Sequence, residues 1–191
     1  MQPGSLYRFS FIAFLSLTVT AYAQDIRDKV AAPPGVPKAS EVIDPDSNIY
    51  GIPFGTTEDQ FIAQFGNPMG YVRLPGGLTG MIYGRSHCFL FAGGQLTGLR
   101  ISHSILDWKL IESISPSLMF DATKWRLTNG ITKDMDLVQV KQILGDQLQT
   151  QQYRRSFFTQ RSKVDLEFSH VLSKGEKEEA YQLFGILITA R

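Results

Sequence analysis

Residues 57–68, with the sequence TEDQFIAQFGNP, predict a short helix with a defined start and end. Thr57 and Gln60 have the spacing of a capping box, in which two side chains satisfy free backbone amides of the first helical turn. The two phenylalanines of this stretch lie one turn apart and so share one face of the helix. Gly66 favours the backbone conformation that ends a helix, and the Asn-Pro pair that follows prevents its continuation.

A second stretch, residues 136–145 with the sequence DLVQVKQILG, has the same design. Asp136 and Gln139 occupy the capping positions, and Gly145 closes the helix. The apolar residues between them form one stripe at helical spacing. The second helix therefore keeps the backbone requirements of the first although most of its side chains differ.

The similarity extends outward from both helices. Residues 51–52 match 130–131 at a shift of 79, and residues 95–102 match 182–189 at a shift of 87. The extra eight residues of the second part are assigned to a charged hairpin within 172–180. Chance matching between apolar segments is the alternative, but the order of the landmarks is the same in both parts. The pattern therefore predicts two tandem repeats.

Apolar and polar residues alternate after each helix, which is typical of strands with one buried face. Such strands are expected at 70–73, 80–84, 87–92 and 96–102 in the first repeat, and at 151–159, 163–170 and 181–190 in the second. The predicted fold class is α+β, with two tandem repeats that each pack a short helical segment on a three- or four-stranded antiparallel sheet.

The N-terminal residues 1–23 are typical of a cleaved signal peptide. Arg8 is their only charge, an apolar run of 12 residues follows it, and Ala21-Tyr22-Ala23 has the form of a cleavage site. The run is shorter than the roughly 20 residues that a membrane span requires. No cysteine stands at the cleavage site to accept a lipid, so we expect a soluble periplasmic or secreted protein with no integral membrane segment after cleavage.

The remaining boundaries follow from composition and periodicity. Prolines at 33, 34 and 37 favour extended backbone and oppose helix formation. The chain is expected to divide into a signal peptide at 1–23, a Pro-rich flexible linker at 24–46, a first repeat at 47–103, a linking helix at 104–120 and a second repeat at 121–191.

Charge and cysteine content exclude several classes of protein. The chain of 191 residues carries a formal net charge of +1, and removal of residues 1–23 leaves 18 basic and 18 acidic residues. Such a balance gives no cationic surplus for a phosphate backbone, so nucleic acid is not an expected partner. The single cysteine, Cys88, excludes a disulfide framework and is expected to be buried as a small apolar residue.

Few residues have the chemistry that catalysis requires. The histidines are His87, His103 and His170, and in a strand His87 and Cys88 point to opposite faces. Neither zinc-ligand spacing nor a catalytic triad is indicated. We expect no catalytic residues, no metal and no cofactor, and a Cys88-dependent enzyme is kept as an alternative.

The order of capped helix, Phe-Gly or Leu-Gly helix end, Tyr-rich hairpin and final strand resembles the SmpA/OmlA-like and β-lactamase-inhibitory-protein-like group of envelope modules. The residues that carry the resemblance are Gly51-Ile52, Thr57–Pro68, Tyr83, Phe89–Phe91 and Gly94–Leu96, with a second set at Gly130-Ile131, Asp136–Gly145, Phe168 and Gln182-Leu183. The chain lacks the lipobox of the lipoprotein branch and the paired cysteines of the tandem inhibitors. The resemblance implies a non-enzymatic binder of another envelope or secreted protein, active in envelope assembly or as an enzyme inhibitor.

Two functional hypotheses follow. In the first, the outer faces of the sheets bind a protein partner, because aromatic and arginine side chains dominate interface energetics. The residues expected to do so are Tyr71, Arg73, Tyr83, Arg100, Tyr153 and Arg155. In the second, a cavity between helix and sheet binds a small molecule or lipid and is lined by Phe61, Phe65, Phe89 and Phe91.

Overall fold

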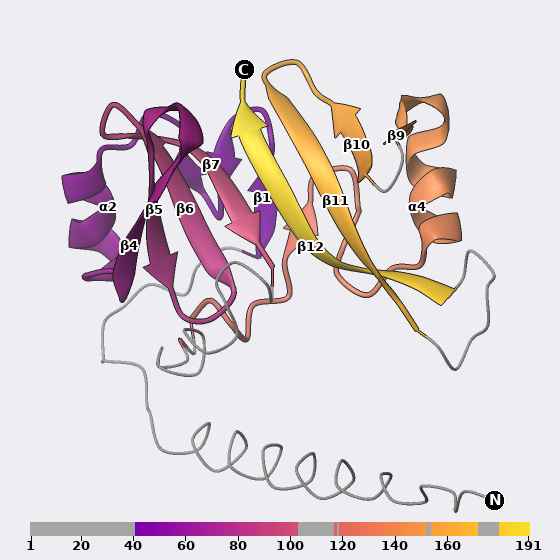
Figure 1. Cartoon of the computed structure of the whole chain (residues 1–191), viewed down its shortest axis with the longest axis horizontal. Coiled ribbons are helices and arrows are strands. Elements are labelled where there is room, and N and C mark those ends of the chain that lie inside the picture. The colour runs from indigo at the N-terminus through magenta and orange to yellow at the C-terminus, as the bar shows by residue number, and fades with distance from the viewer. Residues whose placement is uncertain (1–40, 103–116, 118, 152–153, 172–179) are drawn as a thin grey trace, which may run out of the picture. The chain divides into compact units, whose positions relative to one another are not determined.

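The computed structural model describes residues 41–102, 117, 119–151, 154–171 and 180–191, all within one compact unit that spans Gly35–Arg191. Most described elements are strands in two sheets (Figure 1). The larger sheet has eight antiparallel strands, in the order β4 (Gly70–Leu74), β5 (Leu78–Tyr83), β6 (His87–Ala92), β7 (Gln95–Ile101), β12 (Tyr181–Ala190), β11 (Ser162–His170), β10 (Arg154–Phe158) and β9 (Gln149–Gln151).

The smaller sheet has four short strands. Their order is β3 (Ile52–Pro53), β2 (Asn48–Ile49), β1 (Val42–Asp44) and β8 (Arg126–Leu127), with β1 and β8 parallel and the other pairs antiparallel. Three-residue 3-10 helices, η1 (Pro75–Gly77) and η2 (Gly145–Gln147), complete the described elements together with two α-helices.

The predicted fold class is wrong. The described residues are mostly β, in sheets of four and eight strands, and they do not form two repeats that each pack a helix on a sheet of their own. Strand β7 pairs with β12, so the expected strands of both parts join in one continuous sheet. The four-stranded sheet was not predicted, because strands of two or three residues carry no measurable periodicity.

Both predicted helices are confirmed at their capping boxes. Helix α2 (Glu58–Phe65) is capped by Thr57 and Gln60, and helix α4 (Leu137–Leu144) by Asp136 and Gln139, with each pair bonded reciprocally. Figure 1 shows α2 beside the β4–β7 end of the large sheet and α4 beside the β9–β12 end. Phe61 of α2, and Val140 and Leu144 of α4, belong to the same hydrophobic cluster as the strands.

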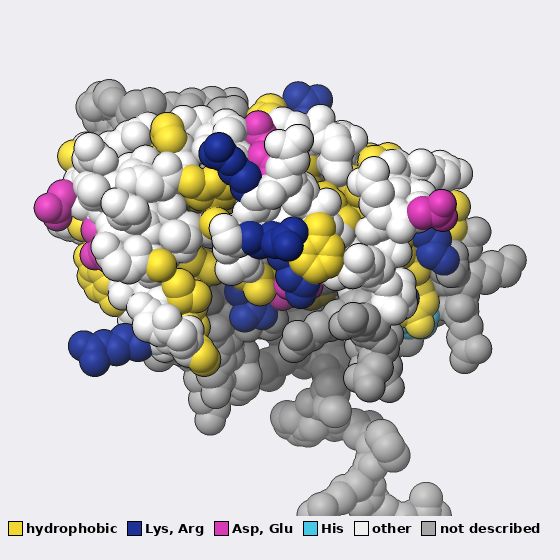
Figure 2. All heavy atoms as spheres, turned by 90° about the horizontal axis from the view of Figure 1, so that it is seen from above, with side chains coloured by type: hydrophobic (Ala, Val, Ile, Leu, Met, Phe, Trp, Pro, Cys, Tyr) yellow, Lys and Arg dark blue, Asp and Glu magenta, His cyan; other side chains and the backbone are white. Residues whose placement is uncertain are grey.

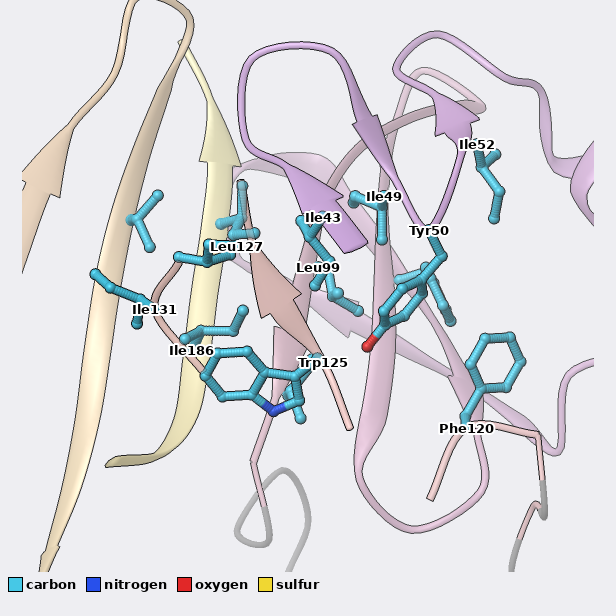
Figure 3. Close-up of a cluster of buried hydrophobic side chains, with 14 of the residues drawn as sticks. Ile43, Ile49, Tyr50, Ile52, Leu99, Phe120, Trp125, Leu127, Ile131 and Ile186 are labelled. Carbon is cyan, nitrogen blue, oxygen red and sulfur yellow. The ribbon is translucent and has the colours of Figure 1, made fainter. Parts of the chain in front are cut away.

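That cluster lies between the two sheets (Figure 3) and includes side chains of both helices. Ile43, Ile49 and Leu127 of the small sheet are almost fully buried against Leu99 and Ile186 of the large one. The opposite face of the large sheet carries a second, smaller cluster formed by Ile82, Cys88 and Leu90, with Val72, Leu74 and Leu187 packed against it. The large sheet therefore has apolar side chains on both faces.

The other predicted boundaries are described in part. The expected linker, 24–46, includes β1, whose Ile43 is fully buried, so an ordered strand begins at Val42. The expected signal peptide, 1–23, and most of the expected linking helix, 104–120, lie outside the described residues. Within the described ranges, no helix has the length and apolar character needed to cross a membrane.

Candidate functional site

A chain of four polar side chains runs through the interior beside the end of β6. The Tyr50 hydroxyl lies 2.7 Å from His87 Nε2, and Ser86 Oγ lies 2.9 Å from His87 Nδ1. Ser86 Oγ also donates to Asp121 Oδ1 over 2.6 Å. His87 is 1% exposed, so the imidazole has no access to bulk water.

The hydrogen bonds specify one arrangement of protons. A carboxylate only accepts, so the Ser86 proton lies toward Asp121, and His87 Nδ1–H must donate to Ser86 Oγ. The Nε2 atom of neutral His87 then accepts from the Tyr50 hydroxyl. Burial lowers the pKa of His87 to about 3 and raises the pKa of Tyr50, so both groups are neutral at physiological pH.

Asp121 holds the turn that precedes β6. Its carboxylate accepts from the backbone amides of Arg85 (2.9 Å), Ser86 (3.0 Å) and Ser117 (2.8 Å). Gly84 has a φ of +66°, and a Cβ at this position would collide with the Asp121 carboxylate. The turn therefore requires glycine, and Asp121 fixes the position of Ser86 and, through it, of His87.

Tyr50 reaches His87 from a hairpin of the small sheet. Tyr50 and Gly51 connect β2 to β3 with φ values of 57° and 82°, as in a two-residue type I′ turn. Left-handed backbone is rare for a bulky aromatic residue. The hydrogen bond to His87 and the burial of the ring, which is 3% exposed, compensate for this conformation.

A small pocket lies at the end of this polar chain. It has a volume of about 20 Å³, and its lining includes Ser86, His87, Asp121, Trp125 and Lys133. Trp125 is 1% exposed, and its indole Nε1 has no hydrogen-bond partner among the described residues. A buried donor without an acceptor costs about 1–3 kcal/mol. Trp125 therefore brings to the pocket lining a donor that has no partner among the described residues.

The predicted binding residues do not form one site. Tyr71 and Arg73 lie on β4, an edge strand, and both are exposed; Tyr71 has 58% of its surface accessible. Through the strand register, Tyr71 shares a face of the sheet with Met81, whereas Arg100 pairs with Cys88 on the opposite face. Among the predicted residues that the structure describes, only Tyr71 and Arg73 share a strand.

The remaining predicted residues have other surroundings. Tyr83 is buried and donates to the backbone oxygen of Gly66 over 2.7 Å, which ties β5 to the end of α2. Arg100 is half-buried and pairs with Glu167 at 3.1 Å. Arg155 is half-buried on β10, with its guanidinium over the rings of Phe168 and Tyr181. Tyr153 lies outside the described residues.

The four phenylalanines that were expected to line a ligand cavity between helix and sheet pack against one another instead. Phe61 lies with its ring centroid 4.9 Å from Phe65, 4.6 Å from Phe89 and 5.6 Å from Phe91. Rings at these separations are in direct contact. The four phenylalanines therefore form part of the packed core.

Cys88 and the described histidines lie in different surroundings. Cys88 is 1% exposed, and burial raises the pKa of its thiol to about 11. Register places Cys88 and His87 on opposite faces, as the sequence predicted. His170 is exposed beside Tyr181, and His103 lies outside the described residues. No group of three potential metal ligands occurs in the ranges that were described.

Sequence reasoning missed the contributors to the polar chain and the pocket. Tyr50, Ser86, Asp121, Trp125 and Lys133 come from separate turns and strand ends. Asp121 is 35 residues from Ser86, and no local spacing links them. Gly84 was the one available signal, since a glycine at the end of a predicted strand indicates a tight turn.

Comparisons with known proteins place the chain in no family. No family model matches the sequence, and no curated protein sequence matches it. A structural match was found to a 1.5 Å crystal structure of an extracellular protein containing a SCP domain from Bacillus anthracis str. Ames. It has 8% sequence identity and a TM-score of 0.44, and the match covers 84% of this chain and 48% of that one. The chain thus spans about half the length of that protein.

Proposed function

We propose that the protein is an exported, non-enzymatic binding module that acts in the periplasm on another envelope or secreted protein. The observation that carries this proposal is the edge strand β4. Met69, Tyr71 and Arg73 occupy alternate positions at this edge, and all three are exposed. The partner would contact this row, which we call the β4 row.

The edge position of β4 supports the proposal. One side of β4 pairs with β5, and the other pairs with no described strand. Since no described strand pairs with its backbone on that side, an extended segment of a partner could add to the sheet there as a further strand. Side chains at alternate positions would then supply specificity, since they share one face of the sheet.

The chemistry of the β4 row also fits a protein partner. Met69 is 45% exposed and Tyr71 58%, the two largest exposed fractions among the large hydrophobic side chains described, and neighbouring exposed apolar side chains are typical of interaction sites. Tyrosine and arginine are enriched among residues that dominate interface energies. On the face in Figure 2, basic side chains are interspersed with acidic and apolar ones, which favours a protein over a nucleic acid.

The proposal is tested by comparing co-purified proteins. A Tyr71→Ala, Arg73→Ala double variant is expected to lose a partner that the unchanged chain retains from periplasmic extract. The matched control is Phe158→Ala, Arg191→Ala, which removes another exposed aromatic and arginine pair, at a ring distance of 5.2 Å, from a different part of the sheet. Loss of two such contacts weakens binding by about a hundredfold or more.

The two double variants decide the outcome. Retention of the partner by the control and loss by the β4-row variant supports the proposal. Identical partners for all three chains, or equal loss from both variants, contradicts it. Circular dichroism of each variant confirms that the fold is intact, so that loss of binding is attributed to the surface.

A further inference from the structure

Among the described residues that line the pocket beside the polar chain, the charged and ring groups of Asp121 and His87 are already engaged in hydrogen bonds. The Asp121 oxygens already accept from the Ser86 hydroxyl and from backbone amides, and both His87 nitrogens are engaged. Two further lining side chains act only as donors: the Trp125 indole, whose N–H is buried without a partner among the described residues, and Lys133. These donors favour an entering group that accepts hydrogen bonds.

The chain holds these two donors in fixed register. Arg126 and Thr132 form an antiparallel bridge, and Leu127 donates to the backbone oxygen of Ile131 over 2.8 Å. The next opposed pair in this register is Trp125 and Lys133. The Thr132 hydroxyl donates to the Trp125 backbone oxygen over 2.8 Å, which closes the hairpin at the same point. Figure 3 shows the Trp125 ring nitrogen directed away from the labelled apolar side chains.

We propose that this pocket binds a carboxylate. One carboxylate oxygen accepts from Trp125 Nε1–H, and the negative charge is balanced by Lys133. The volume of about 20 Å³ fits an oxygen-sized group, and the pocket is partly open, so the rest of the ligand extends outward. Charge-assisted hydrogen bonds of this kind are stronger than neutral ones, which favours a carboxylate over water or an amide carbonyl.

Among the described residues that line the pocket, Asp121 is the charged group that opposes an anion. Its carboxylate already accepts from three backbone amides and one hydroxyl, which disperse its charge. Lys133 adds a full positive charge to the same lining. The site is independent of the β4 row, so failure of one proposal leaves the other untouched.

The test is an NMR titration of the indole N–H groups with sodium acetate at constant ionic strength. The chain has two tryptophans, and a Trp125→Phe or Trp108→Phe variant assigns their resonances. We expect a saturable shift of the Trp125 resonance with acetate and none with chloride. Acetamide, which has the same shape without the charge, is expected to bind about tenfold or more weakly.

Lysine variants identify the cationic partner. Lys133→Met is expected to weaken acetate binding about tenfold. Lys124→Met, which removes an exposed lysine of the same segment, should leave it unchanged. N-acetylglycine, which resembles the C-terminal residue of a polypeptide, distinguishes two sources of the carboxylate. Tighter binding than acetate indicates the C-terminus of a partner chain, and equal binding indicates a small free acid. A Trp125 resonance that does not move with either acid, or moves equally with acetamide or in both lysine variants, overturns the proposal.

Discussion

At the scale of single residues, His87 shows how a basic side chain can be buried without its charge. Its two ring nitrogens both have partners in the neutral form, one as donor to Ser86 and one as acceptor from Tyr50. Protonation would place a charge among aromatic rings such as Phe89 and Phe120. The pKa of His87 is therefore lowered by burial to about 3.

This lowered pKa predicts a dependence of stability on pH. Between about 3 and 6.5 the unfolded chain binds the His87 proton and the folded chain does not, so stability is lost as the pH falls through this window. The slope from one such group is at most about 1.4 kcal/mol per pH unit. Urea unfolding of the unchanged protein and a His87→Gln variant, measured across this window, should show a smaller slope for the variant. Equal slopes would assign the pH dependence to other groups.

Residue-level predictions from the sequence succeeded where local pattern decides the outcome. The opposite orientation of His87 and Cys88 follows from strand alternation alone, and burial of Cys88 follows from its type. Exposure is not local: Tyr71 is open because β4 is an edge strand, whereas Tyr83 is buried on the neighbouring strand. The order of the strands in the sheet decides this difference in exposure. Local sequence patterns do not show that order.

At the scale of elements, helix ends were predictable because capping is a local interaction. The Asp136 side chain accepts from the backbone N–H of Gln139 at 2.8 Å, and the Gln139 side chain accepts from the backbone N–H of Asp136 at 2.9 Å. The long strands β6, β11 and β12 were also expected at nearly their observed positions. Strands β1, β2, β3 and β8 were missed, since each has two or three residues.

The capping box of α4 gives a prediction at this scale. Asp136→Ala removes the acceptor of the Gln139 amide and is expected to lower the free energy of unfolding by about 1 kcal/mol. Asp146→Ala is the matched control, since Asp146 is an exposed aspartate of η2. It should change stability by less than about 0.5 kcal/mol. Denaturant unfolding measures both, and equal effects would show that the cap contributes nothing specific.

At the scale of the whole molecule, the fold depends on a pairing that is distant in sequence. Ile101 of β7 lies opposite Ile186 of β12, and this junction turns two sets of four strands into one sheet. Local patterns located the strands but could not show that the two sets pair edge to edge. Local patterns also could not show the small sheet that covers the same core, because β1 pairs with β8, a strand more than eighty residues further along the sequence.

The β7–β12 junction should therefore control the stability of the entire unit. A Cβ on Gly98 would collide with the backbone oxygen of Ile188, which a strand in mid-sheet cannot easily move. Gly98→Ala is expected to destabilise the protein by about 1–3 kcal/mol. Gly70→Ala is the control, since its Cβ would meet only an Ile82 side-chain atom at 3.9 Å.

Because both helices and both sheets share one hydrophobic cluster, loss of this junction cannot be confined to one end of the sheet. Tryptophan fluorescence and far-ultraviolet circular dichroism should follow a single unfolding transition, at lower urea concentration for Gly98→Ala than for Gly70→Ala. Separate transitions for the two signals would instead show that the parts on either side of the junction fold independently. Equal midpoints for the two variants would show that the strands can separate enough at Gly98 to accept a methyl group.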